Sequence, residues 1–466
     1  MGSKKTDKNK MKIHLFLLLC TWPSTFGTIT PNSSHLRQWI VHNSGYVRNG
    51  VDVCNVHHSR GLCSSLPLKK DDVIATIPQE VLITTSSATT FSRTAFTLSR
   101  KWETNLLPSP IMVQRMLIAV FLLEQIQSNN TSYSPYVDSL PSSLAHLPIF
   151  WSQKKLKSAL QTSHLTDVLT NVHSLIEQGY SDGICPVVPS FCVHFTMQDY
   201  MWAIGIVRSR GFETEQGSVV MVPFGDMLNH NASPTVSWAL RQGTVVLRST
   251  SVLPAGTELS IFYGTLDAAK LLSTYGFSHN ISRWKSTVLV PEDDEHGTPA
   301  AAFQLTTEID TQAIKLIHFV CAQGLPATTI QDAMQKLNTL VKEHMREMES
   351  FSRSFSLAPR IQFDPELLYH ARQYRAGELH VLDYWKNLTD TSRGSEKKRF
   401  HVGSTKYLMH GLYFRLVRIV RIVGKGKKEE EMFDVVFTSG TKILNVKRDD
   451  LLDEATYVHF LCSLQN

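Results

Sequence analysis

The feature that most constrains this chain is a set of three short segments between residues 222 and 277. Val222–His230 is an apolar stretch that ends in Asn229-His230, and Ile261–Gly264 is a second apolar stretch that ends in a Tyr-Gly pair. Tyr275–Phe277 follows, where a short helix is expected to end on an aromatic residue. Short apolar runs bounded by turn residues predict buried strands. The segments therefore predict a β-rich region whose strand ends present side chains able to bind a ligand.

The size and composition of the chain predict a globular protein. With 466 residues it has room for two or three domains and a sizeable core. Hydrophobic residues make up 42% and charged residues 19%, which excludes a largely disordered chain. The net charge of +6 is spread along the chain, so nucleic acid is not indicated as a partner.

The cysteines argue against a metal site. Seven are scattered along the chain, at positions 20, 54, 63, 185, 192, 321 and 462. None has the C-x-x-C spacing that is typical of zinc sites, so we expect no bound metal. This composition reads as poor in disulfides, which favours an intracellular protein.

The first 34 residues favour a different compartment. Lysines precede the short apolar run Ile13–Trp22, and small residues follow, a pattern that resembles a secretory signal peptide. The run is too short to span a bilayer. N-x-S/T sequons occur at Asn32, Asn129, Asn130, Asn231, Asn280 and Asn387. The alternative is a disordered leader, and the compartment stays open between cytoplasm or nucleus and the secretory pathway.

Hydrophobic patterns divide the rest of the chain. Strands are expected around 51–84 and 218–263, separated by a helical stretch at about 90–200. Within that stretch, Ile111–Ile126 carries polar residues and is expected to be a buried core helix, so no transmembrane span is expected. Helices are expected again from about 302 to 385. A basic linker at 393–404 precedes a tail at 405–466 that is rich in β-formers.

Four segments, taken in order, resemble parts of a SET domain. They are Ser59–Leu62 with Leu68–Pro78, Ile206–Phe212, Val222–His230 and Ile261–Phe277. A long insert after the first segment and the element Arg375–Leu382 resemble the branch of the Rubisco large-subunit methyltransferases. The resemblance implies an α+β fold: a SET domain at 35–290 with a threaded, pseudoknotted active site and a helical insert. An all-α substrate-binding domain at 291–392 and the small β-rich tail would follow.

The resemblance implies S-adenosylmethionine (SAM) as cofactor and a protein carrying a target lysine as substrate. It assigns cofactor binding to eight residues: His58, Ser59, Arg60, Arg210, Asp226, Asn229, His230 and Phe277. It assigns catalysis to Tyr263 and substrate binding to Phe212 and Tyr275. Asn and His offer donors and acceptors for an adenine edge, and an arginine can pair with the SAM carboxylate.

Methyl transfer to an amine needs alignment, desolvation and the handling of one proton. The Tyr263 hydroxyl is expected to orient the amine, and the sulfonium charge lowers the amine's pKa. The sequence contains no P-loop, H-E-x-x-H or G-x-S-x-G motif, and it lacks the Rossmann glycine fingerprint. A Rossmann-type methyltransferase is therefore not expected.

Two residues and the tail bear on the alternatives. Phe212 stands where relatives that methylate histidine have an Asn, so lysine is favoured over histidine. Lys270 replaces a glutamate that is common in the family, which favours a second hypothesis, a catalytically silent SET-fold binding module. Under a third, aromatic residues of the tail would form a cage for methylated side chains, although they equally suit the core of a small sheet.

Overall fold

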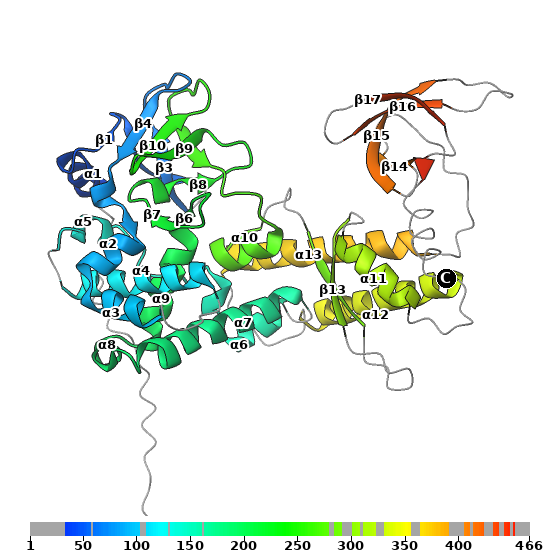
Figure 1. Ribbon diagram of the computed structural model, residues 1–466, viewed down its shortest axis with the longest axis horizontal. Helices are drawn as coiled ribbons and strands as arrows, with labels where there is room; N and C mark the ends of the chain where they lie inside the picture. The colour runs from blue at the N-terminus through cyan, green and yellow to red at the C-terminus, as the bar shows by residue number, and fades with distance from the viewer. Residues whose placement is uncertain are drawn as a thin grey trace, which may run out of the picture.

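The computed structural model describes most of the chain. The described residues are 33–56, 59–102, 109–128, 131–160, 163–278, 284–290, 301–307, 311–322, 330–355, 364–390, 405–410, 413–423, 432–437, 442–447 and 451–452. The leader, apart from its last two residues, and the basic linker therefore lie outside the described residues. Figure 1 shows a strand-rich part in blue and green, with helices packed beneath it and further helices running away from it.

Three small sheets form the strand-rich part. The first has the order β1 (Tyr46–Val47), β4 (Val73–Ile77), β10 (Thr244–Ser249) and β9 (Val236–Arg241). The second has the order β2 (Val51–Val56), β3 (Ser59–Ser64), β11 (Thr257–Ile261) and β8 (Asn229–His230). The third has the order β5 (Ile83–Thr84), β7 (Val219–Met221) and β6 (Gly211–Glu213). Each sheet therefore combines segments from before and after the helical insert.

The helical insert begins at Thr85, slightly before the expected position of about 90. Its elements are α2 (Thr85–Phe91), α3 (Arg93–Trp102), α4 (Pro110–Gln127), α5 (Ser134–Val137), α6 (Gln153–Leu160), α7 (His164–Gln178), α8 (Pro189–His194) and α9 (Met197–Arg210). A capping box starts α9, because Thr196 and Asp199 each accept a backbone hydrogen bond from the other. The helix runs to Arg210, so most of Ile206–Phe212 is helical.

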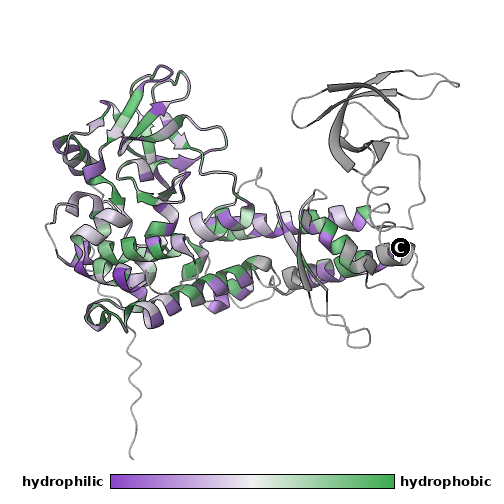
Figure 2. Ribbon diagram, viewed as in Figure 1, coloured by the Kyte–Doolittle hydropathy of each residue, from purple (hydrophilic) through white to green (hydrophobic). Residues whose placement is uncertain are grey.

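The apolar helix α4 lies in the protein core. It is the one described helix with the length and hydropathy of a membrane span. However, its residues Met116–Leu123 are all less than 5% exposed and belong to the main hydrophobic cluster. Figure 2 shows the green, hydrophobic stretches of these helices beneath the strands. The predicted core helix is thereby confirmed.

The region after the SET-like strands is mainly helical, with one difference from expectation. Its helices are α11 (Thr311–Ala322), α12 (Ile330–Phe355) and α13 (Pro365–Leu388). The helical pattern expected from 302 is wrong at its start, because Ala301–Leu305 forms β13 and pairs with β12 (Ser286–Val290). The apolar residues Val288 and Leu305 of this hairpin are fully buried in a second core shared with the helices. A strand can therefore bury these apolar residues as well as a helix could.

The element Arg375–Leu382 joins the two cores. It lies on α13, where the Arg375 guanidinium donates to the Met348 carbonyl at 2.8 Å and Glu378 accepts from Ser163 at 3.0 Å. Gly377 allows close packing, since a Cβ there would lie 2.0 Å from the Trp284 ring. Arg375, Gly377 and Glu378 of this element therefore each contribute to the packing of α13 against its neighbours, which include the insert.

Two further elements complete the description. Helix α1 (Ser33–His42) precedes the first strand, and α10 (Ala268–Tyr275) is followed by its C-cap Gly276, which has a positive φ of 80°. The tail forms a five-stranded sheet in the order β17, β16, β15, β14, β18. Its strands are β14 (Thr405–His410), β15 (Tyr413–Val423), β16 (Met432–Phe437), β17 (Lys442–Lys447) and β18 (Leu451–Leu452). The expected α+β fold class is confirmed.

Candidate active site

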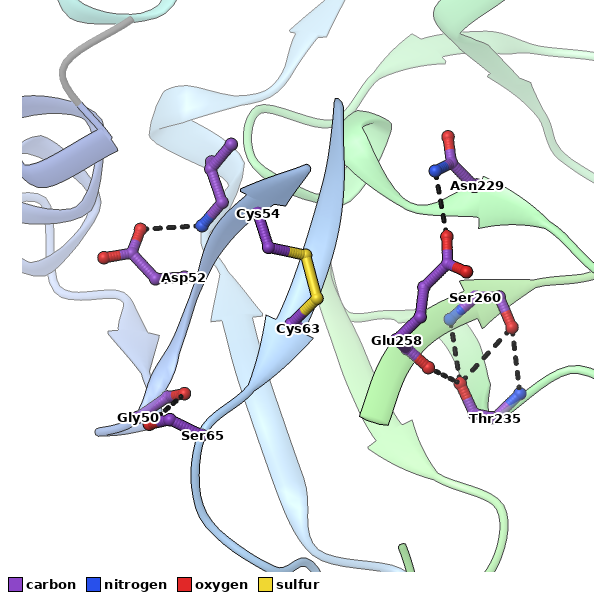
Figure 3. The surroundings of a disulfide bond; sticks show 10 residues. Gly50, Asp52, Cys54, Cys63, Ser65, Asn229, Thr235, Glu258 and Ser260 are labelled. Atoms are coloured by element: carbon purple, nitrogen blue, oxygen red, sulfur yellow. Dashed lines mark hydrogen bonds between the residues drawn. A yellow bond between two sulfur atoms is a disulfide. The ribbon is translucent and has the colours of Figure 1, made fainter. Parts of the chain in front are cut away.

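Asn229 and His230 form strand β8, which pairs in parallel with β11. The Asn229 side-chain amide donates to Glu258 Oε1 at 2.9 Å, as Figure 3 shows. A Cβ at Gly61 would lie 2.7 Å from Asn229 Nδ2, so only glycine fits between β3 and this amide. The glycine of Ser59-Arg60-Gly61, on β3, is thus explained by its close approach to Asn229.

Asp226 lies in a turn with an unusual backbone. Phe224, just before the turn, has φ of 71° and is 1% exposed, a conformation that non-glycine residues rarely adopt. The Asp226 carboxylate accepts from Tyr136 at 3.0 Å and from Arg210 at 3.3 Å. Arg210 also donates to the Asp226 backbone carbonyl at 3.1 Å. The strained turn therefore fixes Asp226 against a helix end and the insert.

Arg60 joins the same buried group. One of its terminal nitrogens donates to the Ser139 carbonyl at 2.8 Å, and burial and the charge of Arg210 lower its pKa. Burial raises the pKa of Tyr136 well above its usual value, and the charge of Asp226 adds to this effect. Arg60 Nη2 and Asp226 Oδ1 have no hydrogen-bond partner among the described residues. The group thus holds one unused donor and one unused acceptor.

Tyr263 lies in the middle of an aromatic cluster. Its hydroxyl donates to the Leu228 carbonyl at 2.8 Å, and its backbone N–H donates to the His230 ring at 3.2 Å. Its ring lies 4.6 Å from that of Tyr275, and the His230 ring stacks on Phe277 at 5.9 Å. Burial raises the pKa of Tyr263, so the phenol stays protonated at neutral pH.

A pocket of about 250 Å³ opens beside Tyr263. Phe212 and Trp238 form one wall, with their rings in an edge-to-face contact at 5.1 Å. Tyr275, Arg210 and Asp226 also line this space. Five of the predicted site residues therefore surround one cavity, namely Tyr263, Phe212, Tyr275, Arg210 and Asp226.

Comparison with known families fits this geometry. The SET domain family profile matches residues 59–264, from strand β3 to the glycine after Tyr263. The chain contains a SET domain. Solved structures of Rubisco large-subunit methyltransferase share its fold. The one bound to sinefungin and monomethyllysine has a TM-score of 0.63, with 17% identity over 78% of this chain and 92% of that one. The one bound to AdoMet has a TM-score of 0.61, with 19% identity and the same coverage.

Curated relatives of the SET domain methylate lysine or histidine. The chain is 28% identical to the fructose-bisphosphate aldolase-lysine N-methyltransferase of Arabidopsis thaliana and 29% identical to the Rubisco large-subunit N-methyltransferase of Nicotiana tabacum. Each match covers 38% of this chain and 40% of the relative. It is 24% identical to the actin-histidine N-methyltransferase of Rattus norvegicus, over 69% of this chain and 55% of the relative. The chain thus spans about half the length of these relatives.

Other predicted residues of the SET domain lie outside the pocket wall. Asn229, His230 and Phe277 do not line it and are connected to Tyr263 by ring contacts or by β8. Arg60 does not line it either, but it is close to Arg210 and Asp226, which do. His58 lies outside the described residues, and Ser59 is described only as backbone in β3. Tyr263 therefore lines the pocket and also contacts a predicted residue outside it, His230.

Sequence reasoning missed several residues of the site. Tyr136, Glu258 and Trp238 contact Asp226, Asn229 and Phe212 respectively. Tyr136 is 90 positions away from Asp226 along the chain, so no local pattern could have revealed the contact. Glu258 is two residues before Ser260, which pairs with Asn229 across β8 and β11, and only the register of those strands brings it there.

The expectation that the chain is poor in disulfides is wrong. Cys54 and Cys63 are bonded across β2 and β3, and Cys185 and Cys192 are bonded beside α8. Figure 3 shows the first bond on the hairpin next to Asn229 and Glu258. The pairing depends on hairpin register and on a turn, which cysteine spacing alone does not give.

Within the described residues, no group of three or more His, Cys, Asp or Glu side chains could hold a metal.

Proposed function

We propose that this protein is a SAM-dependent protein methyltransferase that acts on a lysine side chain. One observation carries the proposal: Tyr263 lines an open pocket and also contacts His230, which does not line it. We assign the methyl donor to the polar and aromatic groups around His230 and Asp226 and the nucleophile to the pocket, so that the two meet at Tyr263. The SET family match over this region and the activities of the relatives support it.

The polar and aromatic residues around Asp226 and His230 suit SAM. Its carboxylate needs a donor and its ammonium needs an acceptor, and the unpartnered Arg60 Nη2 and Asp226 Oδ1 offer one of each. Arg210, Asn229 and His230 supply further polar groups, and Phe277 offers an aromatic face. When bound, SAM supplies the activated methyl group. We assign His58 and Ser59 to the same site from the sequence alone.

Tyr263 suits the positioning of an amine. Its raised pKa keeps the hydroxyl protonated, so it does not act as a general base. Since that hydroxyl donates its proton to the Leu228 carbonyl, its lone pairs can accept a hydrogen bond from the incoming amine. The cationic groups lining the pocket disfavour an ammonium there and so favour the neutral, nucleophilic amine.

Phe212 and Trp238 favour lysine as the target. Their edge-to-face pair makes an apolar wall that suits the methylene stem of a lysine, whereas an imidazole needs a polar partner. Histidine is the second candidate, because the actin-histidine methyltransferase aligns over 69% of this chain. We assign Tyr275, which lies against Tyr263, to the same substrate channel.

The deciding experiment transfers label from SAM to protein. Purified full-length protein is incubated with a cell lysate and SAM carrying a deuterated methyl group, and labelled residues are located by mass spectrometry. A Tyr263→Phe variant is the control. Labelled lysine that falls sharply in the control supports the proposal, and labelled histidine supports the second candidate. If neither protein transfers label although both are folded and bind SAM, the chain is a silent binding module.

The helices beyond the SET domain are the proposed grip for the protein substrate. We assign this role to the region 291–392, whose long helices α12 and α13 enclose a separate hydrophobic core. We assign no separate activity to the tail, which is described as a five-stranded sheet. Removing residues 393–466 is expected to leave methyl transfer in place, and loss of transfer from the folded, truncated protein would contradict that division.

We also propose that the protein folds in the secretory pathway. The two disulfides need an oxidising environment, and the leader resembles a signal peptide. Two relatives are named as chloroplastic, so the competing interpretation is an organelle transit segment. Fractionation of expressing cells and disulfide mapping of the recovered protein decide between them. Reduced cysteines in protein recovered from a cytosolic fraction would refute the proposal.

A further inference from the structure

The pocket beside Tyr263 carries more positive than negative side chains. Its ionisable lining comprises Arg115, Arg208, Arg210 and Lys270 against Glu213 and Asp226. These cations come from three helices, α4, α9 and α10, which converge on the pocket. This excess disfavours an ammonium in the pocket, and it also suits a substrate that brings a negative charge.

Two of the four cations are already paired. Arg210 is bonded to Asp226, and Arg115 to Glu213. Asp267, the acidic residue nearest to Lys270 in the chain, caps α10 and pairs with Lys285 at 2.9 Å. Within the described part of the chain, Arg208 and Lys270 have no ion-pair partner. The unbalanced positive charge of the pocket therefore resides on these two residues.

The charges of these two residues repel each other. Burial lowers the pKa of Arg208 to about 10, and the neighbouring Arg115 adds to this effect. Partial burial together with the charges of Arg208 and Arg115 lowers the pKa of Lys270. An anion placed between them would relieve this cost.

Unused hydrogen-bond donors lie in the same pocket. The Thr274 side chain is 3% exposed, and its hydroxyl has no hydrogen-bond partner among the described residues. The same holds for the buried Arg115 Nε. Both residues line the cavity, and buried donors normally find an acceptor. Two free cations and two free donors on one cavity suit a carboxylate.

We propose that Arg208 and Lys270 bind a carboxylate of the substrate, so the protein selects target residues that have an acidic group beside them. This inference rests on the proposed function and concerns its specificity. The carboxylate belongs to a neighbouring aspartate or glutamate or to the substrate's C-terminus. Lys270 then affects which substrates bind and not whether the site works.

The test is a binding selection with defined peptides. A library of dodecapeptides with a central lysine and randomised flanks, made as both C-terminal acids and amides, is captured on full-length protein with S-adenosylhomocysteine. Asp and Glu are expected to be enriched about tenfold over Asn and Gln near the lysine. If the free acids alone are enriched, the carboxylate is the C-terminus. The inference would be overturned if peptides with Asp or Glu flanks were recovered equally with those that have Asn or Gln flanks, and C-terminal acids equally with C-terminal amides.

Charge reversal sharpens the result. Lys270→Glu is expected to shift enrichment from acidic to basic flanks, and Lys270→Met to abolish it. Lys157→Glu, on the exposed face of α6, changes the net charge equally and is the matched control. Binding of S-adenosylhomocysteine to each variant checks its folding. An unchanged preference in folded Lys270→Glu protein refutes the inference.

The same library separates this inference from the proposed function. If folded protein methylates peptides regardless of flanking charge, the function stands and the specificity is wrong. If acidic peptides bind and Lys270→Glu reverses that preference while no peptide or lysate protein is methylated, the carboxylate site stands and the function is wrong.

Discussion

Two groups of charges near Tyr263 differ in how they are balanced. In the first, the carboxylate of Asp226 faces Arg210 and Arg60, and Glu258 accepts from the Asn229 amide. In the second, Arg208 and Lys270 line the pocket without an ion-pair partner among the described residues. The first arrangement is buried and nearly complete, as a site for one fixed ligand requires. The second is open and unbalanced, so partner choice is expected to be set there.

Removing the charge of Asp226 is expected to have the largest effect. Asp226→Asn would leave Arg60 and Arg210 buried without their counter-charge, which costs about 3 kcal/mol of unfolding free energy. Urea denaturation measures this loss, with the exposed Glu215→Gln as control. A loss no larger than that of the control would mean that the buried side is not held by its charges.

Breaking the Cys54–Cys63 bond is expected to have the next largest effect on stability. The bond joins β2 to β3 across a sequence separation of nine, so its loss costs about 2.5 kcal/mol on chain-entropy grounds. The Cys54→Ser and Cys63→Ser double variant should show a lower urea midpoint and weaker SAM binding, because the hairpin carries Arg60 and Gly61. Equal stability of the double variant and the parent would contradict a structural role for this bond.

Changing the pocket wall is expected to alter selectivity and to spare stability. Phe212→Asn places a polar group beside Trp238, and it should lower transfer to lysine peptides about tenfold relative to histidine peptides. Competition between paired lysine and histidine peptides measures the ratio. Phe212→Leu keeps the wall apolar and is the matched control. An equal ratio in both variants would show that this wall does not choose the target.

The smallest effect concerns pH. Because burial and the charges of Arg208 and Arg115 lower the pKa of Lys270, its charge is lost, as pH rises, before that of an ordinary lysine with a pKa of about 10.4. Preference for acidic peptides should therefore decline at alkaline pH in the parent and persist longer in Lys270→Arg. Peptides with methionine at the target position avoid titration of the target. Parallel profiles for the two proteins would exclude Lys270 as the recognising group.

Local patterns in the sequence predicted much of the fold. Strands are present in both expected stretches, 51–84 and 218–263, and in the tail, and the buried helix α4 is present where Ile111–Ile126 predicts it. The apolar residues from about 302 predict a helix where β13 of the hairpin β12–β13 lies, because buried apolar residues suit either structure.

The site was only partly predictable. The residues that lie together around Tyr263 came from a resemblance to a family, and the SET profile covers that region. What the sequence could not provide was contact between distant segments: Tyr136 with Asp226, Glu258 with Asn229 and Cys54 with Cys63. Each depends on strand register or on how the insert packs. The excess positive charge of the pocket likewise became visible only when α4, α9 and α10 were placed together.

The most direct test of the account measures methyl transfer and SAM affinity together in Tyr263→Phe. Single-turnover transfer from labelled SAM to the identified substrate should fall about 100-fold, because the hydroxyl that positions the amine is gone. SAM affinity, measured by calorimetry, should stay within about threefold of the parent, because the hydroxyl bonds Leu228 and lies outside the Asp226 group. Unchanged transfer, or a loss of transfer fully explained by lost SAM affinity, would contradict the division of the site at Tyr263.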